Sequence, residues 1–169
     1  MKIVIIIPAR WESSRFKGKP LALINNVPMI QRVYEQAIKS KLANKVVVAT
    51  DSIKIFNFCK RKEINVIMTT KKCNSGTDRV YEASKKIKSD IYVNVQGDEP
   101  LINPNSIDDV INLLKINLKK KIISSTGYVN IKSANNKYPE GVYLVCNKFN
   151  EVIFLSRYKI PFNFKKKII

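Results

Sequence analysis

The chain alternates between short apolar runs and longer segments in which apolar residues recur every three or four positions. The clearest run, Ile3–Pro8, is rich in β-branched residues and lacks polar alternation, which is typical of a strand covered on both faces. Similar runs predict buried strands at Val46–Ala49, Val66–Met68 and Ile91–Val95. We expect Ile3–Pro8 to be the central strand of a parallel sheet.

Segments with helical spacing lie between these runs. Pro28 suits a first helical turn, and apolar residues follow it at the spacing of an amphipathic helix. The other predicted helices are a short one over Ile53–Cys59, one capped by Thr77, and one that starts at Asn103–Pro104. Strands and helices therefore alternate along the first two thirds of the chain.

The pattern changes to strands near the carboxyl end. Apolar runs predict strands at Ile122–Ser125, Val142–Cys146 and Val152–Leu155, with Asn147 and Asn150 marking a hairpin turn. Repeated strand–helix–strand units followed by a β-rich end predict an α/β fold with a doubly wound sheet, mainly parallel and mixed late. A length of 169 residues suits one domain, residues 1–169.

The charge balance favours a phosphate-rich or acidic partner. Lys and Arg outnumber Asp and Glu by 31 to 13, which gives a net charge of +18. However, 25 of these cations are Lys, and Lys is also specified by adenine-rich codons, so much of the charge can reflect base composition. The six Arg are more informative, because their planar guanidinium binds oxygen pairs.

Two residue types exclude several kinds of chemistry. The chain contains no His, which excludes His-based metal sites and Ser-His-Asp or Cys-His catalysis. Cys59, Cys73 and Cys146 are too few and too scattered for a disulfide framework or a zinc cluster, so we expect a reducing, cytoplasmic setting.

The apolar run near the start is too short for a secretory signal, and no segment has the length of a transmembrane helix, so we expect no membrane partner.

The loop after the first strand carries candidate phosphate-binding cations. Residues 9–20 contain Arg10, Arg15, Lys17 and Lys19 against Glu12 alone. Ligands of open α/β sheets bind beyond the carboxyl ends of the strands, so this loop is placed to hold a triphosphate. It is not a Walker loop, and an ordinary solvated basic loop is the alternative.

Two later loops add polar and acidic groups. Residues 74–79 place Ser75 and Gly76 ahead of a helix, which suits a polar ligand or a plain capping turn. Residues 94–100 end a buried strand with Asp98 and Glu99. Magnesium prefers carboxylate and phosphate oxygens, so Asp98 is the best candidate metal ligand. Phosphate cations, a polar turn and a metal carboxylate together are what nucleotidyl transfer requires.

Several motifs, in order along the whole chain, resemble those of the 3-deoxy-manno-octulosonate (Kdo) cytidylyltransferases, the CMP-Kdo synthetases. They are Ile7-Pro8-Ala9-Arg10, Ser14-Arg15, Gly18-Lys19-Pro20-Leu21, Ala49-Thr50-Asp51, Ser75-Gly76-Thr77-Asp78-Arg79, Asn94-Val95-Gln96-Gly97-Asp98-Glu99-Pro100, and Ser156-Arg157 with Ile160-Pro161.

The resemblance implies a Rossmann-like, three-layer nucleotidyltransferase fold. It implies CTP and Kdo as substrates, magnesium as cofactor, CMP-Kdo and pyrophosphate as products, and a role in lipopolysaccharide synthesis. The residues it implicates are Arg10, Arg15 and Lys19 for the triphosphate, Ser75 and Arg79 with nearby Gln96 for the cytidine, Asp98 for magnesium, and Arg157 for the sugar acid.

The chain also departs from the family pattern. Lys17, Asp78 and Tyr143 stand where the family usually has Pro, Glu and Lys, and the loss of a cation at Tyr143 predicts weaker sugar or phosphate binding. The chain stops at Ile169, whereas the family continues. The resemblance implies that this continuation carries more of the sugar site, a second acidic metal ligand and much of the contact of a possible homodimer.

Three other functions compete with this interpretation. They are an acylneuraminate-type cytidylyltransferase, which shares the first-loop pattern, an inactive remnant that binds CTP, and a nucleic-acid-binding module that uses the net charge. The last is disfavoured because Lys is spread along the chain and no aromatic residues interleave with it in a recognisable strand motif. We therefore expect small-molecule partners and no nucleic acid.

Overall fold

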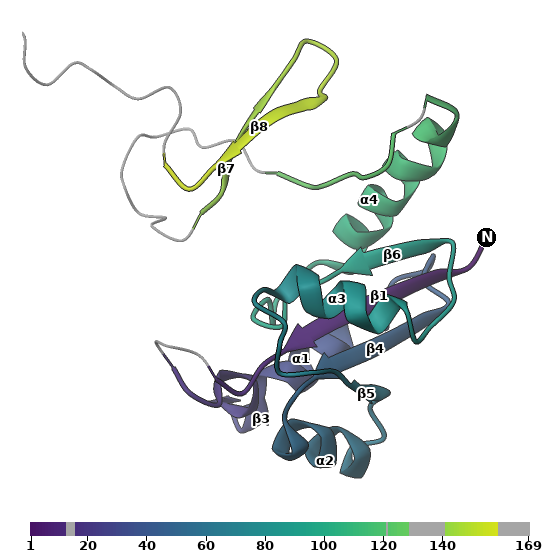
Figure 1. Cartoon of the computed structure of the whole chain (residues 1–169). Helices are drawn as coiled ribbons and strands as arrows, with labels where there is room; N and C mark the ends of the chain where they lie inside the picture. Colours follow the sequence, from purple (N-terminus) through teal and green to yellow (C-terminus); the bar gives the residue numbers. More distant parts are fainter. Residues whose placement is uncertain (13–15, 121, 129–140, 159–169) are drawn as a thin grey trace, which may run out of the picture. The chain divides into compact units, whose positions relative to one another are not determined.

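The computed structural model describes residues 1–12, 16–120, 122–128 and 141–158. Contacts within the chain divide it into two units, residues 1–127 and residues 128–169 (Figure 1). The prediction that residues 1–169 form one domain stays a prediction.

The first unit is built on a four-stranded parallel sheet. Its strands are β1 (Ile3–Ala9), β4 (Lys45–Thr50), β5 (Val66–Met68) and β6 (Ile91–Asn94). They lie in the order β5-β4-β1-β6, and all neighbours are parallel. All seven residues of β1 are buried, which confirms the predicted central strand.

Four helices connect or follow these strands. They are α1 (Met29–Ala37), α2 (Ile53–Arg61), α3 (Gly76–Ser84) and α4 (Pro104–Asn117). The predicted starts of α1 after Pro28 and of α4 after Asn103 are confirmed, and the Asn103 side chain accepts a hydrogen bond from the amide of Asn105 at 2.9 Å. The Asn103 cap fixes where α4 begins, whereas Pro28 precedes α1 without a side-chain cap hydrogen bond.

The first crossover contains two further short elements. The 3₁₀ helix η1 (Lys19–Leu21) precedes a small antiparallel hairpin of β2 (Leu23–Ile24) and β3 (Val27–Pro28). Asn25 and Asn26 form its turn with φ angles of 47° and 62°, values that Asn tolerates better than most residues. A second 3₁₀ helix, η2 (Leu118–Lys120), follows α4.

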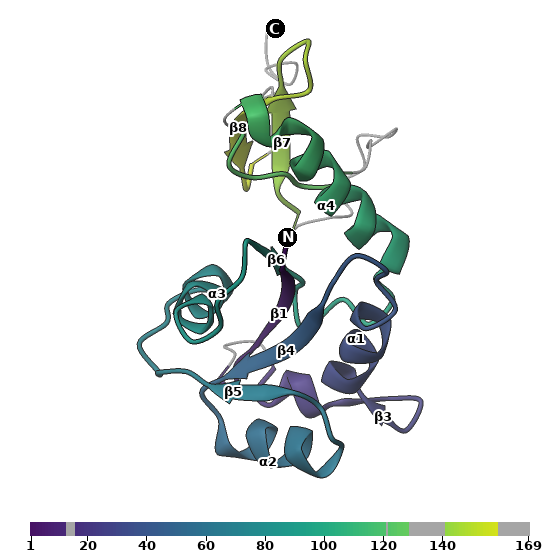
Figure 2. The ribbon, with the colours of Figure 1, turned by 90° about the vertical axis from the view of Figure 1, so that its right-hand side faces the viewer.

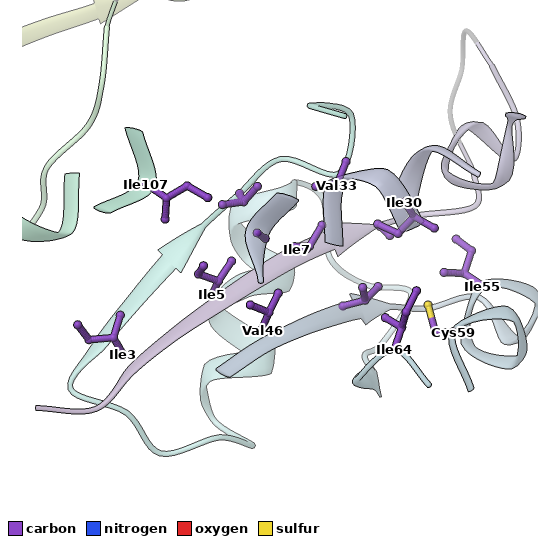
Figure 3. Close-up of a cluster of buried hydrophobic side chains, with 14 of the residues drawn as sticks. Ile3, Ile5, Ile7, Ile30, Val33, Val46, Ile55, Cys59, Ile64 and Ile107 are labelled. Atoms are coloured by element: carbon purple, nitrogen blue, oxygen red, sulfur yellow. The ribbon is translucent and has the colours of Figure 1, made fainter. Parts of the chain in front are cut away.

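The helices cover both faces of the parallel sheet, with α3 on one face and α1 on the other (Figure 2). One apolar cluster contains Ile3, Ile5 and Ile7 of β1 together with residues of α1, α2 and α4 (Figure 3). A second cluster joins Val4 and Ile6 to α3. Alternate residues of β1 therefore pack into apolar clusters on opposite faces of the sheet, which confirms the three-layer α/β class.

The described part of the second unit is an antiparallel hairpin of β7 (Tyr143–Cys146) and β8 (Val152–Ser156). The amide of Asn147 donates to the carbonyl of Glu151 at 2.9 Å, and Asn150 has a φ of 61°, so the predicted turn is confirmed. These strands pair with each other and not with the central sheet, whose four strands are parallel throughout.

The strand predicted at Ile122–Ser125 is wrong. Residues 122–125 form no strand, Ile123 is 94% exposed, and the hydroxyl of Ser125 donates to the carbonyl of Val110 at 2.8 Å. An apolar run becomes a strand only where a neighbouring strand can satisfy its backbone groups, and the described structure provides none for this segment.

Candidate functional site

The strand ends bring three separate loops to one edge of the sheet. Because β1, β4, β5 and β6 are parallel, their carboxyl ends at Ala9, Thr50, Met68 and Asn94 share that edge. The loops that carry the predicted site residues of the first unit start there. This is the edge at which ligands of open α/β sheets bind.

The first loop and the loop after β6 meet through an ion pair. Lys19 Nζ lies 2.7 Å from Asp98 Oδ2, although 79 positions separate the two residues. The Lys19 side chain is 39% exposed and that of Asp98 is 51% exposed, so a ligand can reach both groups. The predicted convergence of the cationic loop and the acidic strand end is therefore found for these two residues.

The other two residues predicted to bind the triphosphate, Arg10 and Arg15, are placed less fully. Arg10 directly follows β1 and is exposed. Arg15 lies outside the described residues. The triphosphate roles of Arg10, Arg15 and Lys19 stay predictions.

Ser75 forms the cap of α3. Its hydroxyl accepts a hydrogen bond from the amide of Asp78 at 3.0 Å, and the Asp78 carboxylate accepts one from the amide of Ser75 at 2.9 Å. This reciprocal pair is a capping box, so the predicted cap at Thr77 is wrong by two positions. The plain capping turn, one of the two alternatives left open by the sequence, is thus present. Contact of Ser75 with cytidine stays a prediction.

Arg79 is held by protein groups inside the first unit. It is 2% exposed, and its Nη2 donates to Asp51 Oδ2 at 2.8 Å. Its Nη1 donates to the hydroxyl of Thr69 and to the carbonyl of Thr70. A buried guanidinium needs such partners, and here they tie α3 to the ends of β4 and β5. This arrangement favours a positioning role for Arg79, while its contact with cytidine stays a prediction.

The loop after β6 packs closely against β1. A Cβ on Gly97 would lie 2.5 Å from the carbonyl oxygen of Pro8, and one on Gly76 would lie 3.3 Å from Gln96 Oε1. Two glycines therefore allow α3, β1 and the loop that carries Gln96 and Asp98 to approach one another. Gln96 is exposed at this junction, and its predicted role near the cytidine is not tested.

Two carboxyl groups near these loops have shifted pKa values. Thr70, first through its hydroxyl, and Cys73 donate hydrogen bonds to Glu82, which lower the pKa of this carboxyl from 4.5 to about 2. Desolvation, and then the neighbouring Asp98 carboxylate, raise the pKa of Glu99. Two adjacent carboxylates at the tip of β6 favour a cation beside them.

Four further residues lie around the site without having been predicted to act there: Asp51, Thr69, Glu82 and Trp11. Asp51 could have been found because, like Asp98, it closely follows a predicted strand. The partners of Glu82 could not, since Thr70 and Cys73 lie in a loop whose path the pattern does not fix. Trp11, at the base of the first loop, carried no chemical signal of its own.

Arg157 directly follows β8, in the second unit, and its predicted contact with the sugar acid stays a prediction. The Ile160-Pro161 motif lies outside the described residues. All three cysteines are free, which agrees with the prediction that they form no disulfide framework.

The described residues hold no cluster of three or more acidic, Cys or His side chains that could bind a metal by themselves. They also contain no helix with the length and apolar character needed to cross a membrane. A hollow of about 460 Å³ lies toward the amino-terminal ends of β4 and β5, and its lining includes Lys45, Lys60 and Lys86 but none of the predicted site residues.

Comparison with known proteins agrees with this geometry. Residues 4–169 match the family model described as cytidylyltransferase. The mitochondrial 3-deoxy-manno-octulosonate cytidylyltransferase of Arabidopsis thaliana is 40% identical over 169 residues, which cover 99% of this chain and 58% of that protein. An 8-amino-3,8-dideoxy-manno-octulosonate cytidylyltransferase of a Shewanella species is 40% identical over 96% of this chain and 67% of that protein.

A solved structure is also similar. A CMP:2-keto-3-deoxy-manno-octonic acid synthetase in complex with CTP superposes with a TM-score of 0.83 at 34% identity, covering 98% of this chain and 68% of that one. The fold is thus that of the nucleotidyltransferases. Within that class, the chain belongs to the cytidylyltransferase family. It spans 58% to 67% of the length of the two curated relatives.

Proposed function

We propose that this protein is a cytidylyltransferase that activates Kdo with CTP and releases CMP-Kdo and pyrophosphate. The observation that carries the proposal is the 2.7 Å contact between Lys19 and Asp98, which joins a cationic loop to an acidic strand end at the ligand-binding edge of the sheet. Family membership and the names of the relatives support the choice of reaction.

The proposed reaction is an in-line displacement at the α-phosphorus of CTP. The anomeric hydroxyl oxygen of Kdo forms the new P–O bond and loses its proton to solvent, while the bond to the pyrophosphate oxygen breaks. Arg10, Arg15 and Lys19 hold the triphosphate and stabilise the charge that builds on the departing pyrophosphate. Ser75, Arg79 and Gln96 position the cytidine, and Arg79 does so through its buried contacts. Arg157 binds the carboxylate of Kdo.

Magnesium fits the acidic tip of β6. Magnesium usually takes one or two protein carboxylates and completes its shell with water and substrate phosphates. Asp98 is half exposed and lies next to Glu99, so it suits such a partial protein site better than a closed cage. When bound, the ion would neutralise phosphate charge, and Asp98 is the residue that would hold it.

The experiment is a pyrophosphate-release assay on the full chain with CTP and Mg²⁺, supplied in turn with Kdo, its 8-amino analogue and N-acetylneuraminate. We expect release with Kdo. The 8-amino sugar is included because the Shewanella relative named for it is as similar as the Arabidopsis one. Release with N-acetylneuraminate but not with Kdo would show that the substrate is N-acetylneuraminate and not Kdo.

A binding measurement separates the remaining alternatives. Calorimetric titration should show binding of CTP with Mg²⁺ and no tight binding of a duplex oligonucleotide. Binding of CTP without pyrophosphate release from any sugar acid would identify a CTP-binding remnant. Tight, salt-sensitive duplex binding without a response to CTP would overturn the proposal.

A further inference from the structure

Trp11 closes the base of the first loop. The amide of Gly18 donates to the carbonyl of Trp11 at 2.9 Å, so the two ends of the loop meet. The indole ring lies over Gly18 so closely that a Cβ there would be 2.9 Å from Cη2 of Trp11. Gly18 also has a φ of 73°, a conformation that other residues rarely adopt.

Lys54 of α2 also contacts this ring. Lys54 Nζ lies 4.7 Å from the centroid of the Trp11 ring, which is within cation–π range. Trp11 is partly buried and also packs against the main apolar cluster. Its ring therefore connects three parts of the unit: the first loop, the core and the start of α2.

This arrangement fixes the backbone that carries the phosphate cations. Arg10 immediately precedes Trp11, and Lys19 immediately follows Gly18. The amide of Leu21 donates to the carbonyl of Gly18 at 2.9 Å, so η1 also starts from the residue that the indole covers. The direction in which Lys19 leaves the loop, toward Asp98, thus depends on the position of Gly18 under the ring.

We propose that Trp11, which contacts both Gly18 and Lys54, is a positioning residue for the triphosphate of the nucleotide. The proposal rests on the proposed function, because it names a residue that sets the geometry of the same site. Trp11 acts through Arg10 and Lys19. Its loss should affect ligands with a triphosphate more than ligands with a single phosphate.

The test compares CTP with CMP, each with Mg²⁺, by calorimetry on the full chain. We expect Trp11→Ala to weaken CTP binding about tenfold or more, because small displacements of charged groups cost large factors. Binding of CMP should change by less than about twofold, within the range of one weak contact. Trp11→Phe, which keeps a ring over Gly18, should recover most of the CTP affinity.

The role of Lys54 is tested with a matched pair of variants. Lys54→Gln should weaken CTP binding by about two- to fivefold, the value of an exposed cation–π contact. Lys60→Gln removes a similar contact, with Phe56 at 5.6 Å, from the same helix but toward the opposite end of the sheet, and should leave CTP binding unchanged.

Fluorescence gives an independent signal, because Trp11 is the only tryptophan of the chain. CTP should change the emission of the wild type with the same midpoint as calorimetry, and CMP should change it much less. Emission that stays constant while CTP binds would overturn the positioning role.

The outcomes separate the two proposals. If the wild type does not bind CTP, both proposals fall. If it binds CTP and Trp11→Ala binds CTP equally well, or loses CTP and CMP binding by the same factor, only the role of Trp11 falls. If Trp11→Ala does not fold, Trp11→Phe and Lys54→Gln take its place. The role of Trp11 is supported if Lys54→Gln binds CTP more weakly than the wild type and its emission still changes on binding. It is overturned if Lys54→Gln binds CTP with unchanged affinity.

Discussion

Lys19 and Arg79 are cations near the same edge of the sheet, but their surroundings differ sharply. Lys19 is 39% exposed and pairs with a half-exposed carboxylate, whereas the side chain of Arg79 is 3% exposed and has protein partners at both terminal nitrogens. An exposed pair such as Lys19–Asp98 adds little to stability and can be opened by a ligand. A buried pair is costly to break, so Arg79 suits a fixed support.

Asp98→Asn tests the proposed metal ligand. The amide keeps the shape of the carboxylate but removes its charge, so Mg²⁺-dependent pyrophosphate release should fall by roughly 100-fold or more. The free energy of unfolding should change by less than about 1 kcal/mol, because the lost ion pair is exposed. Asp109→Asn, at an exposed position on α4, is the matched control. Normal turnover in Asp98→Asn would show that the metal assignment is wrong.

Glu82 makes stability depend on pH. Its folded pKa of about 2 lies below its ordinary value of 4.5, so the ionised carboxylate stabilises the folded state above pH 4.5, and this contribution is lost as the pH falls toward 2. The side chain is 21% exposed, so solvent screening reduces the effect to roughly 1 to 2 kcal/mol.

The measurement is urea unfolding of the wild type and Glu82→Gln at several pH values. The variant should be less stable at pH 6, and the difference should shrink through the window below pH 4.5. Glu12→Gln, whose side chain is 76% exposed and pairs only with Lys17 among the contacts described, should show no such convergence. A constant difference at all pH values would contradict the assignment.

The residues of the site were only partly predictable from the sequence. Lys19 and Asp98 were predictable because loops after parallel strands share an edge, so chain order and charge were enough. Asp51 as the partner of Arg79 was not, because the pairing depends on how α3 is rotated against β4. Local hydrogen bonds of that kind are decided by packing, which hydrophobic periodicity does not encode.

The hydrophobic pattern predicted which helices and strands form more accurately than it predicted where they begin and end. β5 is found at Val66–Met68 as predicted, because a short apolar run between turn residues has few alternatives. The start of α3 was misplaced, since both Ser75 and Thr77 are capping residues and only the reciprocal bond of Asp78 selects Ser75. The apolar run at Ile122–Ser125 forms no strand, because strand formation needs a partner strand that one segment cannot specify.

Gly97→Ala tests how closely β6 and β1 must approach. The new methyl group would lie 2.5 Å from the carbonyl oxygen of Pro8, a backbone atom that cannot move alone, so the loop that carries Asp98 must shift. We expect a loss of roughly 1 to 3 kcal/mol in the free energy of unfolding and at least tenfold slower turnover.

The matched control is Gly127→Ala. Its new methyl group would be 3.7 Å from Cγ2 of Val110, an ordinary contact, so stability and turnover should stay close to the wild type. Thermal unfolding and the pyrophosphate assay measure both variants. Equal effects of the two substitutions would show that the close approach at Pro8 is not the cause.

The whole chain has a strong excess of positive charge. The net charge of +18 should speed the encounter with anionic nucleotides at low ionic strength, an effect that salt screens. Among the described residues, all buried apolar ones lie between Ile3 and Ile111, and none of the second unit is buried. The first unit therefore contains the apolar core of the described structure.

It follows that residues 1–127 should fold without the second unit. We expect this fragment to unfold cooperatively, with a midpoint within about 4 °C of the full chain by circular dichroism. No described residue of the removed segment is buried, so its loss should cost less than about 1 kcal/mol. A fragment that ends at residue 103 is the control: it removes α4, including Ile107 and Ile111, which are 3% and 1% exposed, and it should lose cooperative unfolding. If residues 1–127 also fail to unfold cooperatively, the second unit must stabilise the core, since the fragment retains every buried apolar residue of the described structure.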